Sequence, residues 1–275
     1  MKKLIALMVV CSSFMFGISS SSAAPVVIKI SNPVTENSTW YKGLLKFKEI
    51  IEEKTSGKYE VQIYNSDQLT AGNQTQALEM IQMGATDFDC RGMVIHTVLD
   101  DRFTVVNMPF ILPDLETVDK ILSGSGKEAL FQFASENGLH PLALGESGYR
   151  QITSGPKAIR VPADMKNLKV RIPSMPMFFD LFEILGANPT TINMSEVFTA
   201  LQQGVIDAHE NPLDVSRSYK INEVQKYITL WNAVYDPILF CCSEQFWARL
   251  SDEEKTLFQN ASYEALNYHK QLVRS

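Results

Sequence analysis

The sequence predicts an α/β fold in which two lobes enclose a cleft. Along the chain the hydrophobic periodicity switches repeatedly between two and 3.6 residues, which is typical of strands and helices alternating around mainly parallel sheets. Two passages, the flexible stretch 145–148 and Asp236-Pro237, have the composition of crossings between lobes. Because clefts between domains are common sites for small ligands, these patterns predict a binding fold before any motif is considered.

The first lobe is predicted to begin with a βαβαβ series. Trp40, Leu44, Phe47 and Ile51 recur at helical spacing, and Gly57 stands where that helix should end. The predicted elements are strands at 26–30, 59–64, 87–90 and 140–144, and helices around 40–51, 74–83 and 115–137, the last broken around 124–126.

A second α/β unit is predicted over 148–235, after which the chain returns to the first lobe. Asn193, with Glu196 three residues later, predicts a capping box at the start of one helix. The predicted elements are strands at 150–153, 168–172 and 189–192 and helices at 177–185 and 194–203, then a strand at 238–242 and a long helix from about 252. The first lobe would therefore comprise 25–147 plus 236–275.

The N-terminus has the pattern of a secretory signal peptide covering residues 1–24. Lys2 and Lys3 precede an apolar run at 4–18, and Ala23-Ala24 offers a small-residue cleavage site. A membrane anchor is the alternative, but these 15 residues fall short of the ~20 that span a bilayer. Cys11 is disfavoured as a lipidation site, because bulky valines precede it and the apolar run continues beyond it. We therefore expect a mature protein that is exported across the inner membrane.

Composition narrows the function further. The net charge of −6 makes the chain a poor partner for nucleic acid or an anionic membrane surface. Beyond the predicted signal the cysteines are Cys90, Cys241 and Cys242, an odd number that includes an adjacent pair. No disulfide framework follows, and the apolar surroundings of the pair predict small buried side chains.

Several fragments resemble catalytic motifs, but each lacks an essential residue. After the stretch 124–127, Glu128 stands where a phosphate loop needs Ser or Thr for magnesium. Tyr149 occupies the second glycine position of a nucleophile elbow. The four histidines are widely separated and form no metal-binding spacing. We therefore expect no catalytic residue, metal or cofactor, and we keep a secreted enzyme only as an alternative.

Arg171 is the most promising charged residue in an apolar setting. In the strand 168–172 the alternation places Leu168, Val170 and Ile172 on one face and Arg171 on the other. Its place at the carboxyl end of the strand is where open α/β sheets bind ligands. Taken alone, however, a solvated arginine on a strand edge is the more common explanation.

Several passages closely resemble solute-binding proteins of tripartite ATP-independent periplasmic (TRAP) transporters, of the dicarboxylate-binding DctP type. The passages are KYEVQIY at 58–64 with DQL at 67–69, MPF at 108–110, YRQIT at 149–153, PADMKNLKVRIP at 162–173, LGANPT at 185–190 and SEVFTALQQGVIDAHENP at 195–212. Their order and spacing also fit the family over nearly the whole mature chain.

The resemblance implies a two-lobed, type II-like periplasmic binding protein that delivers an organic acid to small and large membrane permease subunits. It implies that Arg171 forms a salt bridge with the ligand carboxylate, and that Arg150 and Asn211 add polar contacts. A planar guanidinium matches a carboxylate bidentately, which agrees with this role. We expect a monomer with no cofactor; a sensor or scavenging role is an alternative to transport.

Some positions depart from the family pattern or remain open. Ala208-His209 replaces the usual Gly-Gln, and Met194 stands where some relatives have an aromatic residue, so His209 and Met194 are candidate ligand contacts. Arg91, Trp231 and Asn232 are further candidates at neighbouring strand ends, although Arg91 could equally pair with Asp89. Family members usually continue beyond the long terminal helix. This chain is short by comparison, so we expect a truncated C-terminus, which could impair closure of the two lobes.

Overall fold

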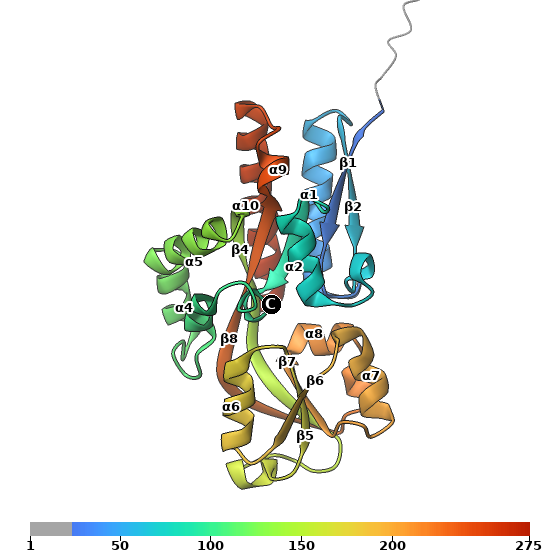
Figure 1. Cartoon of the computed structure of the whole chain (residues 1–275), viewed down its shortest axis with the longest axis vertical. Coiled ribbons are helices and arrows are strands. Elements are labelled where there is room, and N and C mark those ends of the chain that lie inside the picture. The colour runs from blue at the N-terminus through green and yellow to red at the C-terminus, as the bar shows by residue number, and fades with distance from the viewer. Residues whose placement is uncertain (1–23) are drawn as a thin grey trace, which may run out of the picture.

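The computed structural model describes residues 24–275, so the predicted signal sequence and Cys11 lie outside the described residues. One mixed sheet of eight strands runs through both lobes in the order β2-β1-β3-β8-β4-β7-β5-β6 (Figure 1). The two ends of this sheet are parallel, whereas its centre is antiparallel. The two-lobed α/β class predicted from periodicity is confirmed.

The first lobe is built on three parallel strands, β1 (Val26–Ser31), β2 (Tyr59–Tyr64) and β3 (Phe88–Gly92). They are connected by α1 (Thr39–Lys54) and by the pair η1 (Gln68–Thr70) and α2 (Gln74–Gln82), and followed by α3 (Met93–His96) and η2 (Asp101–Asn107). The predicted βαβαβ series is therefore present, with each boundary within a few residues.

The second lobe contains the other parallel set, β5 (Lys169–Ile172), β6 (Asn188–Thr191) and β7 (Ala208–Pro212). Its helical elements are η3 (Pro162–Met165), α6 (Pro176–Ile184), α7 (Met194–Gln202), α8 (Leu213–Ser218) and η4 (Ile221–Glu223). The capping box predicted at Asn193 is wrong, because that side chain makes no capping hydrogen bond and lines a groove instead.

Two long strands, β4 (Leu139–Ser154) and β8 (Tyr227–Ser243), run through both lobes and pair with each other. The passage at 145–148, predicted as a flexible crossing, is part of β4, where Gly145, Glu146 and Gly148 pair with β8. The predicted lobe boundaries, after 147 and after 235, fall inside these two strands. Register shifts interrupt the pairing between Glu146 and Gly148 and at two other places, where the ribbon can bend.

Four more helices cover the first lobe: α4 (Leu115–Leu122), α5 (Ser125–Glu136), α9 (Glu244–Trp247) and α10 (Asp252–Arg274). The predicted break near residue 124 and the predicted terminal helix are both present. A capping box does form at α10, where Ser251 and Glu254 bond each other's backbone N–H groups. No helix within 24–275 is long and apolar enough to cross a membrane.

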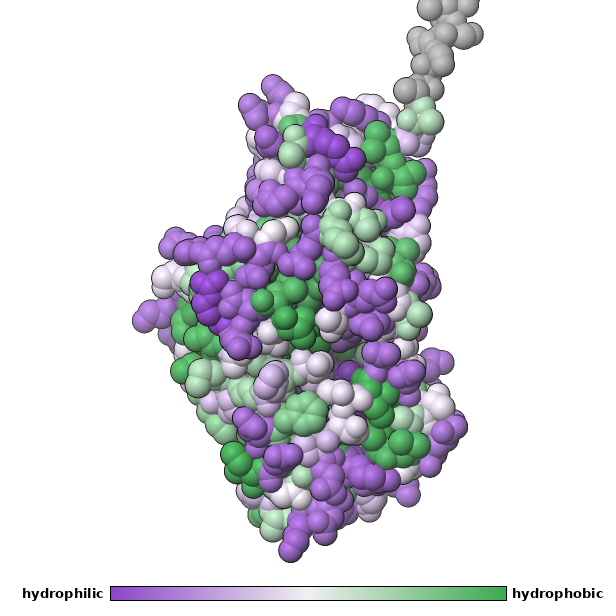
Figure 2. Space-filling view, viewed as in Figure 1, coloured by the Kyte–Doolittle hydropathy of each residue, from purple (hydrophilic) through white to green (hydrophobic). Residues whose placement is uncertain are grey.

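The core of the first lobe is rich in aromatic side chains. Phe88 packs against Phe47, Phe240, Phe246 and Phe258 with ring centroids 4.9–5.8 Å apart. The three cysteines of residues 24–275 are buried free thiols, as predicted for the adjacent pair Cys241 and Cys242 from its apolar surroundings. Figure 2 shows a mainly hydrophilic face, with hydrophobic side chains gathered near the middle of the molecule.

We expect Gly148→Ala to weaken the central ribbon. Gly148 has a φ of +94° at a register shift of β4, and a Cβ there would meet no atom closer than 4.0 Å. The cost is therefore one of backbone strain, about 1–2 kcal/mol of unfolding free energy. Urea unfolding measures it. Gly155→Ala, where φ is not positive and a Cβ would press only on the flexible Gln225 side chain at 3.2 Å, is the matched control; equal stability of the two variants would contradict the assignment.

Stability should also fall in mild acid because of buried neutral histidines. Burial lowers the pKa of His96 to about 3 and that of His269 to about 4. In the unfolded chain these histidines bind protons near pH 6.5, whereas in the folded chain they stay neutral. Their contribution to stability is therefore greatest above that pH and declines below it. His269→Leu should reduce the slope by up to about 1.4 kcal/mol per pH unit between pH 6.5 and 4. Unfolding curves at several pH values test this, and an unchanged slope would contradict it.

Candidate functional site

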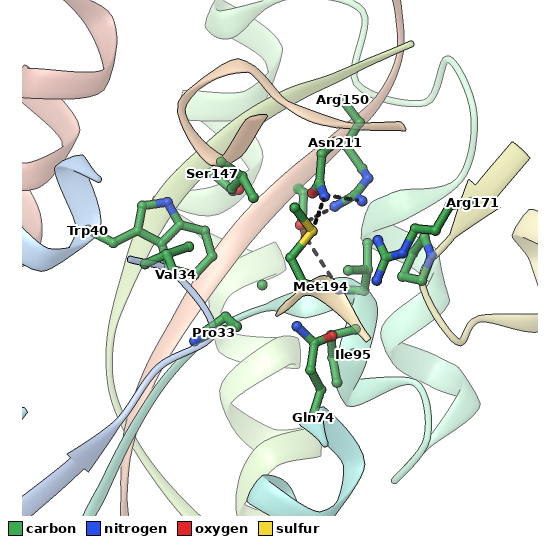
Figure 3. Close-up of a pocket in the computed structure, with 15 residues that line it drawn as sticks. Pro33, Val34, Trp40, Gln74, Ile95, Ser147, Arg150, Arg171, Met194 and Asn211 are labelled. Carbon is green, nitrogen blue, oxygen red and sulfur yellow. Dashed lines mark hydrogen bonds and ion pairs between the residues drawn. The ribbon is translucent and has the colours of Figure 1, made fainter. Parts of the chain in front are cut away.

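A buried cavity lies where the two lobes meet (Figure 3). It is lined from the first lobe by Trp40 of α1, Gln74 of α2 and Ile95 of α3, and from the second by Arg171 of β5 and by residues of α7 and β7. Its volume of about 40 Å³ is room for about three waters. A larger polar groove of about 350 Å³ adjoins it and shares Gln74, Ile95 and Arg171. Arg171 therefore stands where the two spaces meet.

Arg171 is a buried cation without an acidic partner. Its side chain is 4% exposed, and its Nε donates to the carbonyl oxygen of Ile192 at 2.9 Å. No carboxylate among residues 24–275 lies within ion-pair distance of it. Burial, with the nearby charge of Arg150, lowers its pKa to about 10, while Glu210 opposes the shift. Arg171 therefore remains charged at neutral pH, and this side of the cavity suits an anion.

Arg150, by contrast, is already neutralised by two carboxylates. Its Nε and Nη2 donate to Glu210 at 2.7 Å each, and its Nη1 donates to Asp236 at 3.0 Å. Although burial opposes the charged form, these acids raise the pKa of Arg150. Its guanidinium also lies 5.5 Å from the ring centroid of Phe178. Of its five N–H donors, one on Nη1 is left for a ligand.

Asn211 is held in a fixed orientation at the cavity wall. Its Oδ1 accepts from Arg150 at 3.1 Å, and its Nδ2 donates to His209 Nε2 at 2.9 Å and faces the sulfur of Met194 at 3.3 Å. His209 accepts this bond as the neutral ring, because burial and both arginines lower its pKa far below its ordinary value. The weak contact with Met194 is the one that a ligand oxygen could replace.

The structure brings four of the predicted residues to the cavity: Arg150, Arg171, Met194 and Asn211. His209 lies behind Asn211. Arg91 is completely buried away from it, where its guanidinium bonds both Asp67 and Asp89, so the alternative of a structural ion pair is the one observed.

Trp231 and Asn232 are not among the lining residues either. The indole Nε1 of Trp231 donates to the carbonyl oxygen of Arg150 at 2.9 Å, and the Asn232 side chain accepts from Gln151. Both contacts are made within the strands β4 and β8, so these side chains support the sheet beside the cavity.

Among the lining residues that sequence reasoning missed, four have polar side chains: Trp40, Gln74, Ser147 and Asp236. Trp40 was assigned to the buried stripe of a helix and Ser147 to a flexible passage, and nothing local in the sequence distinguishes them. The indole Nε1 of Trp40 and the hydroxyl of Ser147 are buried and make no hydrogen bond within the described part of the chain. Such orphaned polar atoms at a cavity indicate a missing partner.

Gly92 is a lining residue whose lack of a side chain has a clear reason. A Cβ at this position would lie 2.6 Å from Oδ2 of Asp236. Asp236 also accepts from the backbone N–H of Val94 at 3.2 Å and from Asn107. Through these contacts Asp236 connects β8 to the segment of the first lobe that follows β3. In residues 24–275 no group of three His, Cys, Asp or Glu side chains is placed to hold a metal ion.

Comparison with known proteins agrees with this geometry. The model of the bacterial extracellular solute-binding protein family 7 matches residues 30–275. A solute-binding protein of Roseobacter denitrificans is 31% identical over 256 residues, covering 93% of this chain and 78% of its own length. The 2,3-diketo-L-gulonate-binding periplasmic protein YiaO of Escherichia coli is 29% identical, with corresponding coverage of 93% and 77%.

A solved structure shares the fold as well. The crystal structure of a TRAP periplasmic solute-binding protein from Sulfurospirillum deleyianum with bound succinate matches with a TM-score of 0.86 at 32% identity, covering 92% of this chain and 81% of that one. The resemblance inferred from the sequence motifs is confirmed. Its fold, its cavity and the match over residues 30–275 place the chain in one family: it belongs to the bacterial extracellular solute-binding proteins of family 7, which serve TRAP transporters.

Proposed function

We propose that this protein is the periplasmic solute-binding subunit of a TRAP transporter, and that its cavity and the adjoining groove together hold a small carboxylate-bearing organic acid without converting it. One observation carries the proposal: Arg171 is a buried cation at an interlobe cavity and has no acidic partner in the described residues. A ligand carboxylate would supply the missing charge. Among the relatives, one binds 2,3-diketo-L-gulonate and one was solved with succinate, and both compounds are carboxylic acids.

Each residue at the cavity would have a distinct role. Arg171 would bind the carboxylate through its Nη groups, since its Nε is occupied by Ile192. Asn211, oriented by Arg150 and His209, would donate its amide to a ligand oxygen in place of its contact with Met194. Arg150 would add its remaining Nη1 proton, while its main task is structural. Losing one partner of a buried charge pair typically costs ~2–5 kcal/mol, a large share of the ~8 kcal/mol behind a micromolar complex.

Binding would be coupled to lobe closure. Residues of both lobes line the cavity, and the lobes also touch outside it, where Tyr219 donates to the carbonyl oxygen of Pro33 at 2.6 Å and Thr39 donates to Asp214 at 2.9 Å. We propose that a ligand bridging the lobes stabilises this closed arrangement and that the membrane permease subunits recognise it. The monomeric state and the periplasmic location are part of the same proposal.

An acid that is recovered unaltered after binding agrees with transport, whereas turnover of that acid would indicate a secreted enzyme. Loss of uptake of the acid when the gene is deleted would distinguish transport from a sensor or scavenging role.

Replacing Arg171 should abolish binding without harming the fold. In Arg171→Met the uncompensated buried charge disappears, so the melting temperature of the free protein should stay the same or rise. The ligand-induced shift, about 2.7 kcal/mol at 100 times the Kd, should vanish. A thermal-shift screen with dicarboxylates, hydroxy acids, 2-oxo acids and sugar acids measures both. Arg160→Met, at an exposed arginine of the second lobe, should leave the shift intact; a shift that survives in Arg171→Met would show that the anchor is misassigned.

Replacing Arg150, unlike replacing Arg171, should destabilise the free protein. Arg150→Met leaves Glu210 and Asp236 buried without their cation. We expect a loss of about 3–5 kcal/mol of unfolding free energy, because removing one member of a buried ion pair strands the other. Urea unfolding of the free protein measures this, with Arg171→Met as the comparison. Wild-type stability in Arg150→Met would contradict a structural role for the network.

A further inference from the structure

We propose that the cavity, together with the groove that adjoins it at Arg171, selects a monocarboxylate that carries a neutral oxygen, a hydroxyl or carbonyl group, at the end remote from its carboxylate, and that it discriminates against dicarboxylates. This inference rests on the function proposed above and adds a substrate class to it. Three independent features of the lining residues lead to it: the supply of positive charge, the placement of negative charge, and the unpaired neutral donors.

The cavity offers one positive charge that makes no direct ion pair within the described residues, that of Arg171. Among its described lining residues the cations are Arg150 and Arg171, and two acids already neutralise Arg150. Arg91 is absent from the lining and is bound by Asp67 and Asp89. His209, behind the wall, is neutral. One ligand carboxylate can therefore find a charge partner at Arg171, and a second one would be buried without any.

The negative charges of the site oppose a second ligand carboxylate. Asp236 lines the cavity. In the pairing of β8 with β4 it lies opposite Gly148, the residue that follows Ser147. Glu196 lines the adjoining groove, which Arg171 also lines. Each of the two spaces next to Arg171 thus contains a carboxylate, and a second anionic group of a ligand there would be repelled.

The part of the cavity away from Arg171 supplies neutral donors instead. Figure 3 shows Trp40 and Ser147 on one side and Arg171 on the opposite side. The Trp40 indole N–H and the Ser147 hydroxyl belong to residues that are each 4% exposed, and neither has a hydrogen-bond partner among residues 24–275. Gln74, which lines both spaces, adds a neutral amide. A hydroxyl or carbonyl oxygen can accept from these groups at no cost of buried charge, which satisfies atoms that are otherwise orphaned.

Matched pairs of acids that differ at one terminus test this specificity. Isothermal titration calorimetry would compare succinamate with succinate, D-erythronate with meso-tartrate, and D-galactonate with galactarate. In each pair that binds, we expect the monoacid to have a Kd at least about 10-fold lower, because the diacid must bury an unpaired charge.

The outcomes separate this inference from the function on which it rests. If the diacid of the tightest-binding pair binds as well as the monoacid or better, the inference is overturned while the proposed function stands. If no acid of these pairs or of the wider carboxylate screen binds, the proposed function itself is contradicted, and the inference falls with it.

Two substitutions test the neutral donors directly. Ser147→Ala and Trp40→Phe should each raise the Kd of the preferred monoacid by about 2- to 10-fold, the value of one hydrogen bond. Neither should change the Kd of the deoxy analogue that lacks the terminal oxygen. Trp247→Phe is the matched control, since Trp247 stacks on His140 outside the cavity. Equal losses for the acid and its deoxy analogue in both variants would show that these residues only shape the cavity, and would overturn their assignment as donors.

Discussion

The ion-pair network of Arg150 with Glu210 and Asp236 is the interaction on which the rest of the site depends. Its three members lie on three adjacent strands, β4, β7 and β8, at the junction of the lobes. Asp236 extends the network into the first lobe through Val94 and Asn107, and Arg150 extends it to Asn211. Ion pairs and hydrogen bonds offset much of the cost of burying charge, so the three charged groups fix one another's positions.

This network also gives Arg171 its special character. Because Glu210 is engaged bidentately by Arg150, it acts on Arg171 only at longer range. Two arginines in the same cavity thus have different environments: one is neutralised and rigid, and the other is buried without a counterion. An apolar core would not tolerate such a charge at little cost, and a binding site is where a fold can retain it.

The local part of this architecture could be predicted from the sequence, whereas the long-range part could not. Helices and strands follow from periodicity, and α10 and the break between α4 and α5 were placed correctly. The stretch 145–148 resembles a flexible linker, and only its pairing with residues some ninety positions later makes it strand.

The same limit applies to the arginines. The partners of Arg150 are 60 and 86 residues away in the chain, so no local pattern shows that Arg150 is paired and that Arg171 is not. Both arginines that the family resemblance named line the cavity. Their different electrostatic states, however, follow only from the fold. Trp40 and Ser147 were missed for a related reason, because their unpaired atoms are defined by what surrounds them in three dimensions.

The paired strands β4 and β8 determine what kind of motion the molecule can make. Two single-chain linkers would let the lobes swivel and slide independently, but a hydrogen-bonded ribbon resists shear along its length and stretches little. It yields mainly by flexing at its irregular positions, which include the register shift beside Gly148. Such a ribbon favours bending of one lobe toward the other over independent sliding or swivelling of the two.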